Sequence, residues 1–436
     1  MNQKIVSAKY IMPIPGKILE NHYVTVVNGR ITGISKFHTM KTTGTQSEFI
    51  SLGNSVLMPG FVNAHVNLEL CSDSLSSNDP CDYFSMLDQV TKQRQFNADN
   101  PFALKNNVQN AIDKLIRGGS TSIGNFTTTL ETSTQVLDRN LTAVEFAESH
   151  SLFRDDNEER FIQNDQLRTE IKLKVLQKIE NQVKPVKFEV GVAPRSIYSS
   201  NPEFLDQFFS LFTKENIRFA THIAEHEDED RLFQLGDGKV FEYLVKRYDL
   251  LDYEFPPAAS AVEFLASMLE EFDKTALNYT PMIVNASYVD EEDIKFLADL
   301  KSSVVFCPSF YESFENRHAR KFPFKQFIDK LIPVALGTDS TMAGSNLSML
   351  DEIRLLARNN PELLVTDMLR MATINGAKAL NITDSAGIIS ENRIADLIAI
   401  EIPANTTPED VATEIIYGSG EVKMTMLKGD IAHMKF

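Results

Sequence analysis

The sequence predicts an α/β fold, in which a TIM (β/α)8 barrel is joined to a small β-sandwich built from both chain ends. Apolar strand-like runs alternate with longer amphipathic segments through residues 56–388, which is typical of β/α repeats around a parallel sheet. Eight such runs occur there, the number that a barrel requires. Shorter strand-like runs occupy both ends of the chain. They favour one sheet domain assembled from the two termini.

The terminal segments are expected to be β-rich. Residues 4–12, 23–27 and 30–35 are strand-like, and Asn28-Gly29 separates the last two runs. An Asn-Gly pair between alternating apolar residues is a strong hairpin signal. Residues 394–401 and 422–431 have the same character. We therefore predict a sandwich domain made of residues 1–55 and 389–436, and a barrel domain made of residues 56–388.

The middle of the chain supplies the barrel elements. The expected strands are residues 56–66, 120–126, 141–146, 187–192, 218–223, 281–286, 302–307 and 332–337, and helical patterns include residues 102–117, 167–182, 204–212 and 291–300. An open doubly wound sheet is the alternative, but the chain has no G-x-G-x-x-G or G-x-x-x-x-G-K-[ST] motif to support it. Residues 225–257 are expected to form an irregular loop over the barrel mouth.

Net charge, cysteine content and the length of apolar runs exclude several classes of protein. The formal net charge is −17, which argues against non-specific binding to nucleic acid or to an anionic membrane. Cys71, Cys81 and Cys307 show no C-x-x-C spacing, so reduced thiols are expected. No apolar run approaches the roughly 18 residues of a membrane span. These features predict a cytoplasmic protein whose partner is a small-molecule substrate.

Polar residues follow the expected strands at their C-terminal ends, where barrel proteins build their sites. His65 and Asn67 share one face because they are two residues apart in a strand. A lone His-x-Asn more often caps a loop, but the remaining strands end in a similar way. Their polar residues are Asn125, Glu145, Arg195, His222 with Glu225, Asn285, Cys307 and Asp339. The whole set predicts a site at the barrel mouth.

Several segments resemble the amidohydrolase superfamily, and the nearest branch is that of purine-type and aminofutalosine-type deaminases and chlorohydrolase-like enzymes. The matching segments are Met58-Pro-Gly-Phe-Val-Asn-Ala-His65, Thr221-His-Ile-Ala-Glu225, Cys307-Pro-Ser309, Gly337-Thr-Asp-Ser340, Asn375-Gly-Ala-Lys-Ala379 and Ala395-Asp-Leu397. The resemblance implies a barrel that holds one divalent metal, zinc or iron. Such a metal lowers the pKa of a bound water, which attacks a C–N bond.

The resemblance also implies roles for single residues. His65, His222 and Asp339 match metal ligands, and Asn67 stands where the second His of an H-x-H pair belongs. Glu225 matches the acid/base group, so Glu225 and Asp339 are the expected catalytic residues. Because Asn67 departs from this family pattern, we expect metal binding that is weaker than in the family, or absent.

Three further residues are expected to bind substrate: Arg195, Asn285 and Glu69. Arg195 stands where this branch has a substrate-binding His, and Asn285 stands where the sixth strand carries a His. Glu69 is expected to line the mouth, although a solvated loop carboxylate is the alternative. For Arg195 the two interpretations are a cation that offsets Glu225 and Asp339 in place of a metal, and an ordinary surface arginine.

Two functions follow. The first is a hydrolase or deaminase that acts on a C–N bond of a heterocyclic, purine-like molecule through a metal-activated water. The second is a catalytically silent, metal-free protein with a degenerate active site that retains a ligand-binding pocket. The resemblance leaves the choice between a monomer and a homodimer open.

Overall fold

A parallel eight-stranded sheet forms the centre of the computed structural model, which describes residues 3–37, 47–72, 82–152, 154–248, 257–270, 278–314 and 321–435. The strands follow one another in chain order around the sheet. They are β8 (Phe61–Val66), β9 (Ser120–Thr127), β10 (Thr142–Ser149), β11 (Phe188–Pro194), β12 (Arg218–Ile223), β13 (Met282–Asn285), β14 (Ser303–Phe306) and β15 (Val334–Leu336). The order confirms the predicted α/β barrel and excludes the doubly wound alternative.

The barrel closes between its first and last strands. Val66 forms a parallel bridge with Asp339, and the backbone N–H of Asp339 donates to the carbonyl of His65 at 3.1 Å. The N–H of Asn67 donates in turn to the carbonyl of Asp339 at 2.8 Å. Because the closing bonds run through these residues, the barrel seam and the expected site coincide.

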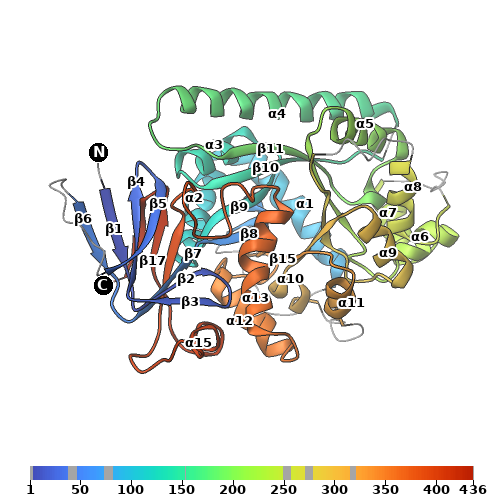
Figure 1. Ribbon diagram of the computed structural model, residues 1–436. Helices are drawn as coiled ribbons and strands as arrows, with labels where there is room; N and C mark the ends of the chain where they lie inside the picture. The colour runs from blue at the N-terminus through green and yellow to red at the C-terminus, as the bar shows by residue number, and fades with distance from the viewer. Residues whose placement is uncertain are drawn as a thin grey trace.

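Helices surround the barrel, and the longest, α4 (Asn157–Glu180), runs along its outside (Figure 1). The others are α1 (Tyr83–Asp99), α2 (Pro101–Arg117), α3 (Leu130–Asp138), α5 (Pro202–Lys214), α6 (Glu229–Leu235), α7 (Lys239–Tyr248), α8 (Ala261–Glu270), α9 (Glu291–Asp299), α10 (Pro308–Glu312), α11 (Phe324–Asp329), α12 (Met349–Asn359), α13 (Val365–Arg370), α14 (Gly376–Ala379) and α15 (Val411–Tyr417). The expectation of an irregular segment at 225–257 was wrong, because α6 and α7 form within it. Residues 225–230 are an acidic run, and its Glu229 and Asp230 lie in the first turn of α6, where negative charge favours a helix.

Both ends of the chain form two further sheets, which Figure 1 shows beside the barrel. One has the order β5-β4-β1-β6, and the other has the order β18-β17-β16-β7-β2-β3. Their strands are β1 (Gln3–Ser7), β2 (Tyr10–Ile14), β3 (Lys17–Glu20), β4 (His22–Val27), β5 (Arg30–Lys36), β6 (Ser47–Ser51), β7 (Ser55–Pro59), β16 (Leu397–Glu401), β17 (Val422–Leu427) and β18 (Asp430–Met434). Asn28 and Gly29 both have positive φ between β4 and β5, as the predicted hairpin requires.

The run expected as one strand at 56–66 is divided. Its first part, β7, pairs with β16 and β2 in the six-stranded sheet, and only β8 enters the barrel. Gly60 lies at the break, where an added Cβ would meet the side chain of Thr121 at 2.0 Å. Glycine therefore permits the close approach at which the chain passes from one sheet to the other.

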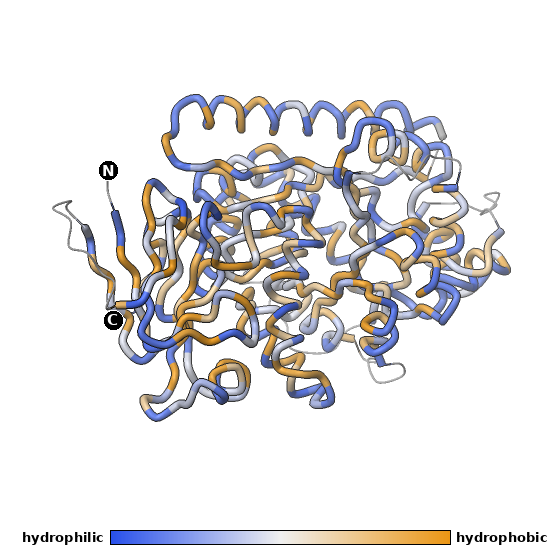
Figure 2. Tube along the Cα trace, viewed as in Figure 1, coloured by the Kyte–Doolittle hydropathy of each residue, from blue (hydrophilic) through white to orange (hydrophobic). Residues whose placement is uncertain are grey.

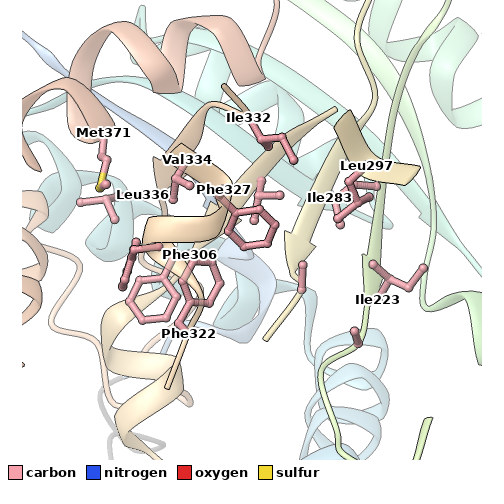
Figure 3. Close-up of a cluster of buried hydrophobic side chains, with 14 of the residues drawn as sticks. Ile223, Ile283, Leu297, Phe306, Phe322, Phe327, Ile332, Val334, Leu336 and Met371 are labelled. Atoms are coloured by element: carbon pink, nitrogen blue, oxygen red, sulfur yellow. The ribbon is translucent and has the colours of Figure 1, made fainter. Parts of the chain in front are cut away.

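Apolar side chains fill the barrel and the space between its strands and helices. Every barrel strand contributes to one buried cluster: Val62, Ala64, Phe126, Val144, Phe146, Ala193, Ala220, Met282, Val284, Val305 and Ala335. On β12, Ala220 belongs to this inner cluster, so His222, two residues later, faces the interior as well. Figure 3 shows part of a second cluster, in which Phe306 and Phe322 pack with ring centroids 4.5 Å apart.

Hydropathy follows this arrangement: hydrophobic residues concentrate in the strands, whereas the exterior helix α4 alternates hydrophilic and hydrophobic stretches (Figure 2). Among the described helices, none has the length and apolar character needed to cross a membrane. Cys71 and Cys307 are free and buried, and Cys81 lies outside the described residues.

Candidate active site

Three of the expected metal ligands lie in contact at the barrel mouth. The Nε2 atom of His65, on β8, lies 3.4 Å from Nε2 of His222, on β12. The same His65 atom lies 3.3 Å from Oδ2 of Asp339, which follows β15. All three side chains are buried. Residues 65, 222 and 339 are thus brought together by β8, β12 and β15, as the strand pattern predicted.

Burial and neighbouring charges shift the pKa values of Asp339 and His222 in this cluster. Burial alone would raise the pKa of Asp339, but the hydrogen bond from His65 and the positive charge of Arg195 hold it below its ordinary value. Burial lowers the pKa of His222 well below its ordinary value, and Arg195 adds to this effect. His222 is therefore neutral at physiological pH, with a nitrogen lone pair available.

Asn67 lies beside the cluster with an unused side chain. It is buried, and neither its Oδ1 nor its Nδ2 atom has a hydrogen-bond partner. The Nδ1 atoms of His65 and His222 are also buried without partners. Buried polar atoms are nearly always paired in folded proteins. These atoms at the barrel mouth therefore have free hydrogen-bonding capacity.

The donor set at this cluster does not make a complete metal site. Metal-bound imidazoles usually donate their second ring N–H to an acceptor, which His65 and His222 lack at Nδ1. Asn67 offers an amide where zinc sites use imidazole, thiolate or carboxylate. Across the part of the chain that the structure describes, no group of three or more His, Cys, Asp or Glu side chains is arranged to hold a metal ion.

Glu225 is a buried carboxyl held by two side chains. The side-chain amide of Asn285, the last residue of β13, donates to its Oε1 atom, and the hydroxyl of Tyr83 donates to Oε2 at 3.0 Å. Burial raises the pKa of Glu225 above its ordinary value, although Arg195 and both hydrogen bonds oppose the rise. A carboxyl of this kind transfers protons at a pH nearer neutrality. Asn285 therefore orients the expected acid/base group.

The loop that carries Glu225 is fixed by Glu229, a residue that sequence reasoning missed. The carboxylate of Glu229 accepts the backbone N–H groups of Ala224 and Glu225, each at 2.7 Å, and that of His226 at 3.1 Å. Burial and the neighbouring Glu225 raise the pKa of Glu229 to about 8. Its position four residues after Glu225, in an acidic run, was the available signal.

Arg195 is a largely buried cation, with 15% of its side chain exposed. Its Nη1 atom lies 3.5 Å from the carboxylate of Glu148, which also forms an ion pair with Arg94. Burial opposes ionisation of Glu148, but the two arginines lower its pKa to about 2. The surface interpretation of Arg195 was therefore wrong. No motif marked Arg94 or Glu148, and their pairing joins α1 to β10.

Glu69 is buried rather than solvated. Its carboxylate accepts the hydroxyl of Thr127 at 2.8 Å and the backbone N–H groups of Thr128 and Thr129 at 2.9 and 3.1 Å. These bonds order the turn after β9. The alternative of a solvated loop carboxylate was therefore wrong, and a direct role in binding substrate stays a prediction.

Two other strand-end residues also have internal partners. The Oε2 atom of Glu145 accepts the side-chain amide of Asn125 and the hydroxyl of Ser133, both at 2.8 Å. Burial raises the pKa of the Cys307 thiol well above its ordinary value. A neutral buried thiol is unreactive, which agrees with a structural role for Cys307.

Part of the backbone at the barrel mouth is strained. Non-glycine residues with positive φ lie at the end of β13 or just after β11, β12, β13 and β15: Ser196, Ala224, Asn285, Ala286 and Asp339. Residues held in this region persist only where the surrounding structure over-determines them, which is common at functional sites.

The chain is similar in sequence to known proteins. Residues 56–432 match the model described as the amidohydrolase family. A 5-methylthioadenosine/S-adenosylhomocysteine deaminase of Caldicellulosiruptor saccharolyticus is 28% identical over 260 residues, which cover 57% of this chain and 53% of the relative. A 5'-deoxyadenosine deaminase of Methanosphaera stadtmanae is 27% identical over 241 residues, 53% of this chain and 49% of the relative. The matched segment thus spans about half the length of these curated relatives.

Solved structures extend the likeness over the whole chain. Aminofutalosine deaminase from Helicobacter pylori matches with a TM-score of 0.77 and 20% identity, over 99% of this chain and 100% of that one. An adenosine deaminase from Xanthomonas campestris with bound zinc also has a TM-score of 0.77 and 20% identity, over 99% of this chain and 93% of that one. At this identity the likeness supports the fold.

Proposed function

The chain belongs to the amidohydrolase family, and on that premise we propose that it hydrolyses a C–N bond of a purine-like small molecule. The observation that carries the proposal is Glu225, a buried carboxyl with a raised pKa, held by Asn285 and Tyr83 at the barrel mouth. The names of the relatives support a substrate with an adenine-like ring.

In the proposed reaction a water oxygen bonds to the ring carbon that bears an amino group, and the C–N bond to that group then breaks. Glu225 takes a proton from the water and delivers a proton to the substrate, so that ammonia leaves. Asn285 and Tyr83 orient the carboxyl. Arg195 and the carboxylate of Asp339 provide opposite charges around the reacting ring, and Glu69 supports the wall of the mouth.

A divalent metal belongs to this proposal only through the family, in which solved relatives contain zinc. His65, His222, Asp339 and the amide oxygen of Asn67 are the residues that would hold one. Because this donor set is incomplete, no step of the proposed reaction is assigned to a metal ion.

A second candidate function is binding of the same class of molecule without turnover. It is favoured by the amides of Asn67 and Asn285 and the guanidinium of Arg195, which replace imidazoles that the family pattern places at the site. The unpartnered atoms of Asn67, His65 and His222 fit this function equally well. For either function we propose a cytoplasmic location, supported by the free thiols of Cys71 and Cys307.

Ammonia release separates the two functions. The protein is incubated with adenosine, 5'-deoxyadenosine and 5-methylthioadenosine, with and without added zinc, and binding is measured by calorimetry. Release of ammonia that is lost in Glu225→Gln and retained in the control Glu227→Gln supports hydrolysis, since Glu227 is exposed. Saturable binding without ammonia supports the second function. If no compound binds, both candidates are wrong.

A further inference from the structure

A cavity of about 260 Å³ lies beside Arg195, and the proposed hydrolysis makes no use of it. Its polar wall includes Arg94, Arg195, Arg247 and His150. Val90, on α1, and the side chains of α7 form its apolar and aromatic wall. Three arginines around one cavity are unusual in a chain whose formal net charge is −17, and overall repulsion of anions makes a local basic site necessary for any anionic ligand.

The described lining of the cavity is basic, because it includes three arginines and no carboxylate. Arg94 and Arg195 share a single carboxylate, that of Glu148, whose side chain is fully buried. Arg247 has its own partner, Asp88, at 3.7 Å. Burial and the charge of Arg94 lower the pKa of His150 to about 4, so the imidazole is neutral and contributes hydrogen bonding rather than charge. No acidic side chain among the described residues lines the cavity itself, although Glu148 pairs with both guanidinium groups and the carboxyls of Glu225 and Asp339 also act on Arg195.

Hydrogen-bonding capacity remains on the same arginines. The Nε–H group of Arg94 is buried and has no partner. Arg195 approaches Glu148 through Nη1 alone, at 3.5 Å, which is the long end of a hydrogen bond. A guanidinium offers five N–H donors in a planar fork suited to carboxylate and phosphate oxygens. The unused donors and the basic lining therefore favour the same kind of ligand group, an oxyanion.

The cavity adjoins the proposed site of reaction. Tyr198 lines the cavity, and its hydroxyl lies 2.8 Å from the hydroxyl of Tyr83. Tyr83 in turn donates to Glu225 at 3.0 Å. Arg195 also belongs to both places, because it lines the cavity and its charge acts on Glu225 and Asp339. A ligand with its reactive ring near Glu225 would extend a substituent toward Arg94.

We propose that Arg94 and Arg195 form an oxyanion-binding subsite, which holds a carboxylate or phosphate group on the non-reacting part of the ligand. The aromatic and aliphatic side chains of α1 and α7 pack against the apolar link between that group and the ring. The purine-like identity of the ring rests on the proposed function, whereas the subsite itself does not.

Inorganic phosphate and benzoate are the probes for the subsite, and they separate a phosphate ligand from an aromatic carboxylate. Their binding to the full chain is measured by calorimetry at low ionic strength. Arg94→Met should weaken the preferred anion at least about tenfold, because a charge-assisted hydrogen bond is lost. The matched control is Arg139→Met, which removes an exposed arginine that pairs with Asp113 outside the cavity.

Glu148→Gln tests the subsite in the opposite direction, since removing the competing carboxylate should tighten anion binding severalfold. This variant keeps the inference testable where Arg94→Met fails to fold. Failure of both anions to bind the native protein overturns the subsite. The subsite is also overturned if Arg94→Met and Arg139→Met bind the anion with equal affinity.

Measuring the affinities for adenosine and for adenosine 5'-monophosphate distinguishes a failure of this inference from a failure of the proposed function. Native protein should bind the monophosphate more tightly, and in Arg94→Met the ratio of the two affinities should fall toward one. Anion binding without any nucleoside binding would contradict the proposed function and leave the subsite standing. If the protein binds adenosine but neither phosphate nor benzoate, and binds adenosine 5'-monophosphate no more tightly than adenosine, the subsite is wrong and the proposed function still stands.

Discussion

The carboxylate of Glu229 holds the loop that carries Glu225, because it accepts the backbone N–H groups of Glu225 at 2.7 Å and of both neighbouring residues. Ala224 has positive φ in this loop, a conformation that costs free energy and requires support. The orientation of the proposed acid/base group therefore depends on a buried carboxylate one helical turn away.

Replacing Glu229 should loosen this loop. In Glu229→Leu three N–H groups lose their acceptor, and the free energy of unfolding should fall by about 3 kcal/mol or more. Glu229→Gln keeps an amide oxygen that can still accept some of these N–H groups, so the free energy of unfolding should fall less than in Glu229→Leu. Urea unfolding of both variants measures the two free energies and shows whether Glu229→Leu is the less stable protein. The control Glu227→Gln is exposed, and a similar loss there would show that the effect is one of charge alone.

Removing the Tyr83 hydroxyl should change the titration of Glu225. Tyr83→Phe deletes the 3.0 Å hydrogen bond that favours the ionised carboxyl, so the pKa of Glu225 should rise further. The pH dependence of ammonia release, or of nucleoside binding if there is no turnover, should shift to higher pH in the same direction. Tyr417→Phe, at a half-exposed position, should leave it unchanged.

Restoring imidazoles should restore metal affinity. Asn67→His together with Asn285→His returns imidazole, a ligand that zinc prefers, to the two positions where the family pattern places it. The zinc dissociation constant should fall at least about tenfold, as judged by competition with a chromophoric chelator. Adding His65→Ala to this double variant should remove the gain. Equal affinity of the native and double-variant proteins would indicate that the pocket has lost the geometry of a metal site.

Glu145 should make stability depend on pH. Burial raises its pKa from 4.5 to about 7, so the folded state binds the proton more tightly than the unfolded state does. The free energy of unfolding should therefore fall as pH rises from about 4.5 to 7, by up to about 3 kcal/mol from this group.

The neutral isostere Glu145→Gln should flatten that part of the stability profile and be the more stable protein at pH 8. The groups that face this carboxyl are Asn125, Ser133 and the charge of Glu69. Urea unfolding at pH 5 and pH 8 measures the effect. A native profile that is flat over this range, or a variant that falls just as steeply, would contradict the raised pKa.

Much of the barrel could be predicted because its signals are local. The strand expected at 218–223 has those bounds as β12, since period-two alternation and flanking helical patterns are written in adjacent residues. The run at 56–66 was misjudged as a single strand. Its apolar pattern is continuous, and only pairing partners distant in sequence, β2 and β16, decide that β7 leaves the barrel.

The sequence by itself determined the fold class, the family and the positions of His65, His222, Glu225 and Asp339 at strand ends, because short motifs and strand periodicity fix these features. The tertiary structure alone decided which side chains act on one another. Tyr83 reaches Glu225 across 142 positions of the chain, and Arg94 meets Glu148 across 54. Burial and pairing of charges depend on such contacts, and no local pattern encodes them.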